Sequence, residues 1–198
     1  MHRHRRTGGS SLRHREGLLS TVNLHWIFAA VLLAGAACAQ APDQIQINPP
    51  YVRTPANVVS AMLKLAGVKS SDVVYDLGCG DGRIVIAAAK EYGARGVGID
   101  IDPERVQEAR DLARKARVEA LVKFEVNDLF AADFHNATVV MLYLLPDVNL
   151  RLRPKLLKDL QPGTRIVSHD FHMGDWKPDK HQMVDASSHI YLWTVPAK

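Results

Sequence analysis

The glycine-rich segment from Asp76 to Gly82 constrains the fold of this chain more than any other feature. It has the sequence Asp-Leu-Gly-Cys-Gly-Asp-Gly and follows a run of apolar residues that predicts a buried strand. Glycines at every second position after a strand are typical of the turn that enters the first helix of an open α/β sheet. Ligands bind such sheets at this turn, beside the carboxyl ends of the strands. The segment therefore predicts an α/β fold with a ligand site at that edge.

Strands and helices alternate through the rest of the chain, as an α/β fold requires. Apolar runs predict strands at residues 72–77, 96–101, 122–126, 137–144, 165–168 and 190–195. Helical spacing predicts helices at residues 55–66, 83–92, 103–116 and 148–160, with Thr54 capping the first and Asp102 the third. Because the strands are apolar along nearly their whole length, we expect a mostly parallel sheet with helices on both faces. The strand at 137–144 is the most apolar and is predicted to be central.

Residues 1–41 have the pattern of a targeting segment. Basic residues come first, an apolar run follows at residues 26–37, and Ala37-Cys38-Ala39 resembles a signal-peptidase cleavage site. A cleaved signal peptide and an uncleaved membrane anchor over residues 22–41 both fit, and either would place the domain outside the cytoplasm. A misassigned start site, or an anchor in the opposite orientation, would leave the domain in the cytoplasm. Residues 42–54 predict a proline-rich linker, and residues 55–198 the domain itself.

The distribution of charge gives no support for a nucleic-acid partner. The full chain has a net charge of +4. This excess comes from the arginines of residues 1–40, so the remaining residues carry equal numbers of acidic and basic side chains. A neutral domain has no surplus of positive charge for phosphate groups. A nucleic-acid acceptor is therefore not expected.

The residues around the glycine turn distinguish between two cofactors. Asp100 follows the turn by about twenty residues and ends the second predicted strand, where an acidic residue accepts hydrogen bonds from a ribose diol. NAD enzymes also have an acidic residue there, so Asp100 alone does not distinguish the two cofactors. A dinucleotide turn needs a third glycine where this chain has Arg83. Asp76 and Asp81 would repel a diphosphate but attract the ammonium and sulfonium groups of S-adenosylmethionine. These features, with acceptor groups for adenine directly after the third strand, predict S-adenosylmethionine as the cofactor.

The predicted cofactor contacts come from the glycine turn and from the ends of the second and third strands. They are Asp76, Gly78, Cys79, Gly80, Gly82, Asp100, Ile101, Asn127 and Asp128. Some of these residues have a structural alternative: Asp76 could bond the amides of the turn, and Asp128 could cap a helix. Cys79 is expected to contribute its backbone while its thiol stays inert. Tyr51 and Thr54 either close over the cofactor or form a hydrophobic staple for the first helix, and no metal site is expected.

These motifs resemble those of class I S-adenosylmethionine-dependent methyltransferases over roughly residues 50–198. Three segments narrow the resemblance: residues 50–55 (Pro-Tyr-Val-Arg-Thr-Pro), residues 74–83, and residues 142–146 (Leu-Tyr-Leu-Leu-Pro). They are similar to the lysine methyltransferases that modify the ATP synthase c-subunit and the adenine nucleotide translocase, and to their bacterial relatives. The resemblance implies a Rossmann-like, seven-stranded sheet with an antiparallel last strand. It also implies that Asp76, Asp100 and Asp128 contact the methionine amine, the ribose and the adenine.

The expected acceptor side lies at the ends of the fourth and fifth strands. Residues 143–146 stand where amine methyltransferases often carry Asn/Asp-Pro-Pro-Tyr, and the missing polar residue argues against an adenine or amide nitrogen as acceptor. Tyr143 could hold an amine by its ring face or its hydroxyl. A lysine acceptor must lose a proton before it attacks, so we expect His169 or Asp170 to assist in removing it.

Three functions are compatible with these motifs. The narrower resemblance implies an enzyme that N-methylates a protein lysine. The absence of an added substrate-recognition domain favours a small-molecule acceptor. An exported protein that binds the cofactor without catalysis would fit a signal peptide, because the cofactor pool lies in the cytoplasm. If residues 22–41 form an uncleaved anchor, the chain would associate with a membrane whichever of these functions it has.

Overall fold

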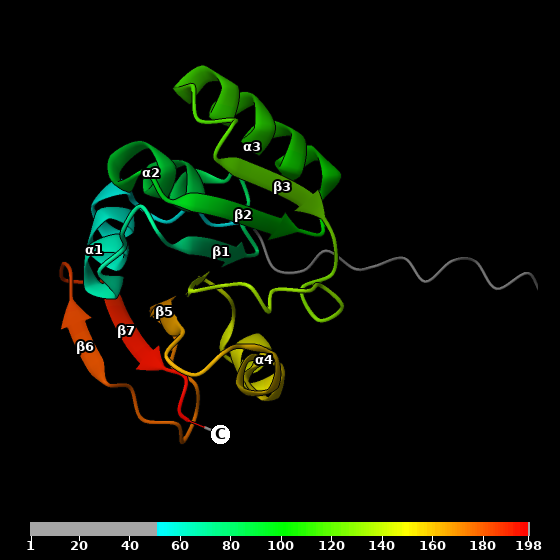
Figure 1. Cartoon of the computed structure of the whole chain (residues 1–198). Helices are drawn as coiled ribbons and strands as arrows, with labels where there is room; N and C mark the ends of the chain where they lie inside the picture. Colours follow the sequence, from blue (N-terminus) through cyan, green and yellow to red (C-terminus); the bar gives the residue numbers. More distant parts are fainter. Residues whose placement is uncertain (1–50, 198) are drawn as a thin grey trace, which may run out of the picture. The chain divides into compact units, whose positions relative to one another are not determined.

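A single seven-stranded sheet organises residues 51–197, which are the residues described by the structure, a computed structural model (Figure 1). Its strands are β1 Val73–Leu77, β2 Arg95–Asp100, β3 Val122–Val126, β4 Val139–Leu142, β5 Arg165–His169, β6 Lys180–Met183 and β7 His189–Thr194. They lie in the order β3-β2-β1-β4-β5-β7-β6, and β7 is antiparallel to both of its neighbours while the other pairs are parallel. The predicted sheet type is therefore confirmed, with β4 at its centre.

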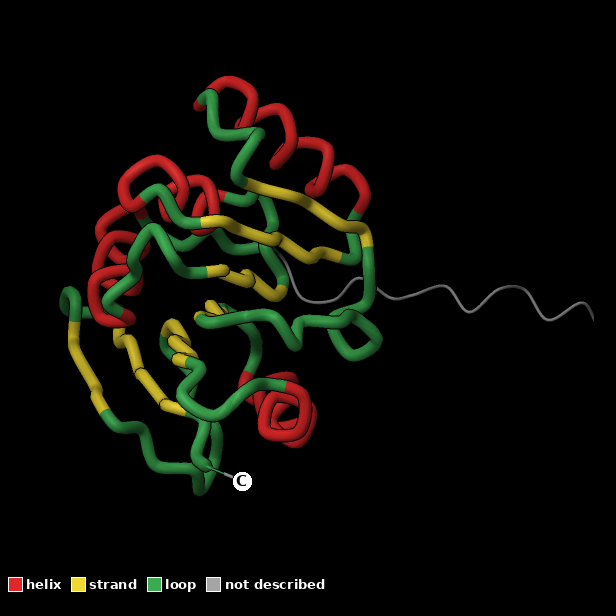
Figure 2. The backbone as a smooth tube through the Cα atoms, in the orientation of Figure 1, coloured by secondary structure: helices red, strands yellow, loops and turns green. Residues whose placement is uncertain are grey.

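Helices cover both faces of this sheet. They are α1 Ala56–Ala66, α2 Arg83–Tyr92, α3 Pro103–Ala116 and α4 Pro146–Asp159. The first three pack on one face and α4 packs on the other, so the strands separate α4 from the rest (Figure 2). No helix among residues 51–197 is both long enough and apolar enough to cross a bilayer. The expected signal peptide or membrane anchor falls outside the described residues.

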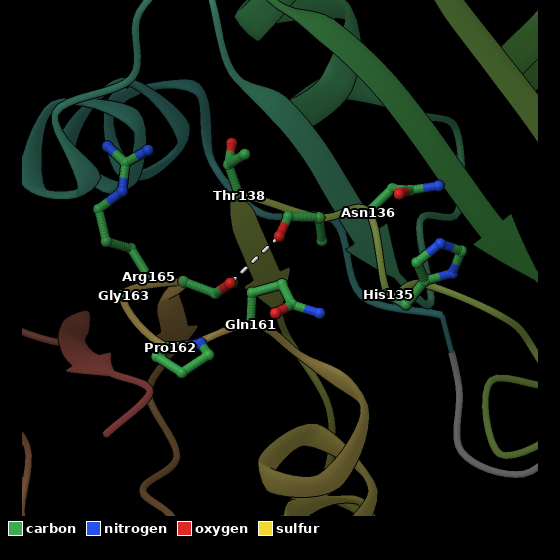
Figure 3. A pocket seen from close by; sticks show the side chains of 9 residues that line it. His135, Asn136, Thr138, Gln161, Pro162, Gly163 and Arg165 are labelled. Carbon is green, nitrogen blue, oxygen red and sulfur yellow. Dashed lines mark hydrogen bonds between the residues drawn. The ribbon is translucent and has the colours of Figure 1, made fainter. Parts of the chain in front are cut away.

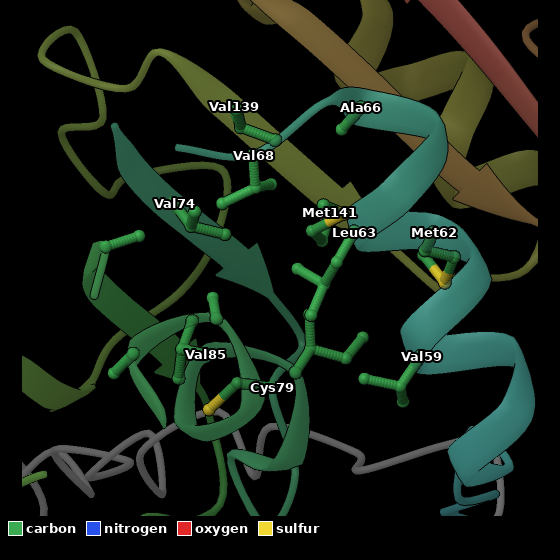
Figure 4. Close-up of a cluster of buried hydrophobic side chains, with 14 of the residues drawn as sticks. Val59, Met62, Leu63, Ala66, Val68, Val74, Cys79, Val85, Val139 and Met141 are labelled. Atoms are coloured by element: carbon green, nitrogen blue, oxygen red, sulfur yellow. The ribbon is translucent and has the colours of Figure 1, made fainter. Parts of the chain in front are cut away.

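The alternation of strand side chains divides the core into two layers. Successive residues of a strand point to opposite faces, so Val74 of β1 and Met141 of β4 pack with Met62 and Leu63 of α1 (Figure 4). Leu142, one residue further along β4, instead joins the buried side chains around α4. Each strand of the centre is thus apolar on both faces, which explains the nearly continuous apolar runs of the sequence.

Most element boundaries follow the sequence pattern, and the departures have local causes. The helices α2 and α3 and the strand β3 have the predicted bounds, and Asp102 caps α3 by accepting a hydrogen bond from the Glu104 amide at 2.8 Å. The prediction that Thr54 caps α1 is wrong: Pro55 is the N-cap residue and no side chain caps the helix. The Thr54 carbonyl instead accepts a hydrogen bond from the Arg83 guanidinium. The strand β6 has four exposed residues and no apolar alternation, so the sequence pattern gave no sign of its position.

An ion pair at the amino edge of the sheet joins α1, β1, β4 and β5. The buried Asp72 carboxylate accepts hydrogen bonds from Arg165, from the Thr138 hydroxyl at 2.7 Å and from the Lys69 amide at 2.7 Å. Arg165 also donates to the carbonyls at the end of α1. Burial alone would raise the pKa of Asp72, but the hydrogen bonds from Thr138 and Lys69 and the charge of Arg165 outweigh burial and lower it. The charged form of Asp72 is therefore the form that the fold stabilises.

We predict that Asp72→Asn lowers the free energy of unfolding by about 2 kcal/mol at pH 7, because a buried charge-assisted network loses one partner. A carboxyl with a lowered pKa contributes stability above its unfolded pKa of about 4 and loses it as the pH falls further. The difference in the free energy of unfolding between wild type and Asp72→Asn should therefore be smaller at pH 3 than at pH 7. Urea titrations at both pH values measure this difference, and an equal difference at the two pH values would contradict the assigned role of the charge.

Candidate functional site

The residues predicted for cofactor and acceptor gather at one edge of the sheet, beside the carboxyl ends of five adjacent parallel strands. Across the sheet they follow the strand order: Asn127 and Asp128 after β3, Asp100 and Ile101 at the end of β2, Asp76 to Gly82 at and after β1, Tyr143 after β4, and His169 and Asp170 at the end of β5. The predicted cofactor residues thus occupy three neighbouring strands. The predicted acceptor residues occupy the next two.

Side chains of the protein fill the space beside the three glycines of the turn. A Cβ atom on Gly78 would lie 2.8 Å from Leu144, one on Gly80 would lie 2.1 Å from the Tyr51 ring, and one on Gly82 would lie 2.4 Å from the Phe124 ring. All three glycines have positive φ angles. The turn therefore needs glycine for its own packing, in addition to the ligand approach expected from the sequence.

Asp100 connects the glycine turn to the end of β2. One carboxylate oxygen accepts a hydrogen bond from the Gly80 amide at 2.7 Å, and the other accepts one from the Asp102 amide at 3.0 Å. These bonds fix the plane of the carboxylate. Because a carboxylate oxygen has two lone pairs, each oxygen retains one with which to accept a ribose hydroxyl.

Asp76 is a buried carboxyl that lacks a counter-charge. It is 3% exposed, and its side chain accepts no hydrogen bond from any residue between 51 and 197. Burial, followed by repulsion from Asp100 and Asp81, raises its pKa to about 8. The alternative in which Asp76 bonds the amides of the turn is not what the structure shows. An ammonium group bound here would supply the missing positive charge, so Asp76 fits the amino group of S-adenosylmethionine.

Asp81 is already paired with cations of the protein itself, which the sequence did not suggest. Its carboxylate pairs with Arg83 at 2.6 Å and with Arg53 at 3.4 Å. Burial alone would raise its pKa, but the hydrogen bonds and charge of Arg83 outweigh burial and lower it. Asp81 therefore stays ionised and already neutralised, and the attraction for a cationic cofactor is concentrated on Asp76.

The remaining predicted cofactor residues lie in the glycine turn or directly after β2 and β3. The backbone amide of Asn127 donates a hydrogen bond to the backbone carbonyl of Asp100 at 2.9 Å, which holds the end of β3 against that of β2. One oxygen of Asp128 accepts a hydrogen bond from the Phe130 backbone amide at 2.8 Å. The residues after β3 form a turn and not the helix that the structural alternative supposed, so this side chain stabilises a turn. Cys79 is buried and burial raises the pKa of its thiol, which keeps it neutral. Ile101 is half-buried directly after β2.

The residues predicted for the acceptor include a buried histidine that lies against the Tyr143 ring. The ring centroid of Tyr143 lies 4.0 Å from that of His169 and 6.3 Å from that of Phe171. His169 is 2% exposed, and neither of its ring nitrogens makes a hydrogen bond. Burial lowers the pKa of His169, an effect that Asp170 and Asp185 partly offset. The imidazole is therefore neutral at pH 7 and can accept a proton.

Asp170 lies beside this histidine in an unusual backbone conformation. Its φ angle is +59°, and one of its oxygens accepts a hydrogen bond from the His189 amide at 2.8 Å. The other oxygen is 3.4 Å from Nε2 of His169. An imidazolium formed on His169 would thus meet a carboxylate at once. Sequence patterns did not single out Arg53, because Asp81 and Glu108, with which it pairs, lie far away along the chain.

A separate cavity of about 380 Å³ lies at the opposite, amino edge of the sheet (Figure 3). His135, Thr138, Gln161 and Arg165 are among the residues that line it. Two of these, Thr138 and Arg165, are already bonded to Asp72. Since ligands of parallel α/β sheets bind beside the carboxyl ends of the strands, this cavity is not the cofactor site.

We predict that the affinity for S-adenosylhomocysteine, which carries the same amino group, rises with pH between 6 and 7.5. The amine of the ligand is mostly cationic in this window, because α-amino groups have a pKa near 8. The pKa of Asp76 is raised to about 8, so its carboxyl must lose a proton before it can pair with that amine. The dissociation constant should weaken by about tenfold for each pH unit lowered. Calorimetric titrations of wild type and Asp76→Asn measure this dependence. The variant should bind weakly at every pH and show no slope; an equal slope in both proteins would refute the assignment.

Comparisons with known proteins agree with this geometry. Residues 76–180 match the family model described as ANTKMT methyltransferase domain. A protein-lysine N-methyltransferase of Saccharolobus islandicus is 43% identical over 150 residues, which are 74% of this chain and 93% of that protein. The ATP synthase c-subunit lysine N-methyltransferase of Xenopus laevis is 34% identical, over 75% of this chain and 65% of that protein.

A solved structure extends these similarities to the cofactor. An RNA methyltransferase from Salinibacter ruber in complex with S-adenosyl-L-homocysteine is 56% identical and superposes with a TM-score of 0.73, covering 74% of this chain and 95% of that one. The fold, the cofactor and the class of reaction are thus established together. The chain belongs to the ANTKMT methyltransferase domain family and is an S-adenosylmethionine-dependent methyltransferase.

Proposed function

We propose that this enzyme transfers the methyl group to the side-chain nitrogen of a protein lysine. The observation that carries the proposal is the neutral, buried His169, which lies between the Tyr143 ring and the Asp170 carboxylate at the strand ends next to the cofactor residues. A lysine has a pKa near 10.4, so at pH 7 it arrives as an ammonium ion and must lose a proton. An amine acceptor needs such a base, and the names of the relatives from Saccharolobus and Xenopus point to lysine.

The side chains of the acceptor side divide the work between binding and proton removal. S-adenosylmethionine supplies an activated methyl group on a sulfonium centre, so the protein has to orient the acceptor and exclude water. The Tyr143 and Phe171 rings would hold the cationic amine by its attraction to their faces. His169 would then take the proton, and Asp170 would stabilise the resulting imidazolium. The lone pair that is released on the lysine nitrogen is the nucleophile.

An RNA acceptor, which the name of the Salinibacter protein suggests for that protein, is less well supported here. Residues 41–198 carry as many acidic as basic side chains, so they offer no net attraction to a phosphate backbone. Two carboxylates, those of Asp170 and Asp185, act on His169 through their charge. Their negative charge favours a cation over a polyanion. The acceptor side therefore fits an ammonium better than a nucleic acid.

We predict that tritiated S-adenosylmethionine labels a protein band in cell fractions and that the label stays on lysine after acid hydrolysis. Asp100→Ala, which loses the carboxylate that fixes Gly80 and faces the ribose, should abolish the labelling. Digestion of the sample with ribonuclease or protease before counting separates the acceptor classes. Label that is lost with ribonuclease, or that appears only in a small molecule, would overturn the lysine proposal while leaving methyl transfer intact.

We predict that His169→Gln lowers kcat by about a hundredfold or more, the usual contribution of a general base, while the affinity for S-adenosylhomocysteine stays unchanged. Burial lowers the pKa of His169, so wild-type kcat should fall only as the pH drops below about 6.5. Asp170→Asn is the matched control for charge. Asparagine tolerates the left-handed backbone and can keep the bond to the His189 amide, so a smaller loss is expected. Full activity of His169→Gln would exclude it as the base.

A further inference from the structure

The segment Tyr51–Thr54, which we call the strap, lies against the glycine turn just before α1. The Tyr51 ring occupies the space where a side chain on Gly80 would stand, 2.1 Å from the ideal Cβ position. Its hydroxyl accepts a hydrogen bond from the Asp81 amide at 3.1 Å. A cofactor that reaches from Asp76 to Asp100 must lie along this same turn, because the Gly80 amide is bonded to Asp100. The strap and the cofactor therefore share one surface.

Arg53 holds the strap to two different parts of the domain. Its guanidinium lies 3.4 Å from the Asp81 carboxylate in the turn and 3.0 Å from the Glu108 carboxylate on α3. Arg105, which also pairs with Glu108, places its guanidinium 5.0 Å from the centre of the Tyr51 ring. The ring is thus held between the glycine turn on one side and a cation from α3 on the other. Arg53 alone thus connects the strap both to the glycine turn, through Asp81, and to α3, through Glu108.

The strap is weakly anchored in comparison with the core. Tyr51 is 41% exposed and Val52 is 59% exposed, and the Arg53 side chain is 53% exposed. Only Thr54 is buried, and its carbonyl is held by Arg83. Segments that bury little apolar surface and depend on exposed ion pairs open at low free-energy cost. Movement about Thr54 would break the contacts of Tyr51 and Arg53 and leave α1 in place.

We infer that the strap is the gate through which the cofactor enters and its product leaves, and that Arg53 is the latch of this gate. S-adenosylhomocysteine has to leave after every turnover, so opening of the strap would set an upper limit on kcat. The latch acts on the cofactor site alone, and the inference does not depend on lysine as the acceptor. Because a gate is an obstacle to both entry and exit, a weaker latch should change both rates and leave their ratio nearly unchanged.

The test is the rate of exchange of S-adenosylhomocysteine in Arg53→Met, which keeps the apolar stem and removes the charge. The full chain is loaded with tritiated S-adenosylhomocysteine and chased with unlabelled ligand, and association is followed separately. Both rates should rise by about fivefold, as expected for the loss of exposed ion pairs, while their ratio changes less than twofold. Glu108→Gln, which removes one partner of the latch from α3, should accelerate both rates in the same direction.

Arg114→Met is the matched control, because Arg114 is an arginine of α3 whose ion pair with Asp111 lies on the exposed surface. It should exchange ligand at the wild-type rates. Unchanged rates in Arg53→Met would show that the strap does not limit exchange and would overturn the inference. Faster dissociation with unchanged association would equally overturn it, because Arg53 would then hold the bound ligand rather than a gate.

Discussion

The hydrogen bonds between the glycine turn and the end of β2 are the constraint on which the rest of the site depends. The amides of Gly78 and Cys79 both donate to the Ile99 carbonyl, at 2.8 and 2.9 Å, and the Gly80 amide donates to the Asp100 carboxylate. Three consecutive amides of the turn are thus bonded to the neighbouring strand. These bonds fix the path of the chain between β1 and α2. They also fix the carboxylate of Asp100, the residue predicted to bind the ribose, against the turn.

Three acidic residues within this small region have different surroundings, and the differences determine their roles. Asp81 is neutralised by Arg83 and Arg53, and Asp100 is held by backbone amides. Asp76 has neither, and its pKa rises to about 8 because burial and the other two carboxylates oppose its ionisation. Only the residue without a partner among those that the structure describes is left to pair with a ligand cation. The arrangement concentrates the affinity for an ammonium group at the end of β1.

Sequence patterns predicted those features that depend on neighbours along the chain. The bounds of α2 and α3, the Asp102 cap and the position of Asp100 at the end of β2 depend on local spacing, and all of them are confirmed. Asp76 lies within β1, and Asp128 follows β3 closely. Arg53, the distant partner of Asp81, was not predictable, because it lies in a segment with the composition of a linker and far from Asp81 along the chain. The exposed, polar β6 was likewise invisible, since its pairing with β7 is backbone bonding that leaves no apolar pattern.

The cofactor and acceptor halves of the site are coupled through packing rather than through charge. Leu144, the residue after Tyr143, fills the space beside Gly78, so the position of the Tyr143 ring follows that of the glycine turn. The Tyr143 ring in turn lies against the His169 ring at the end of β5, and the nitrogens of the His169 ring make no hydrogen bond that would fix it. A shift of the turn would therefore move the ring and then the imidazole. Because β4 lies between β1 and β5, this packing links the residues predicted for the cofactor to those predicted for the acceptor.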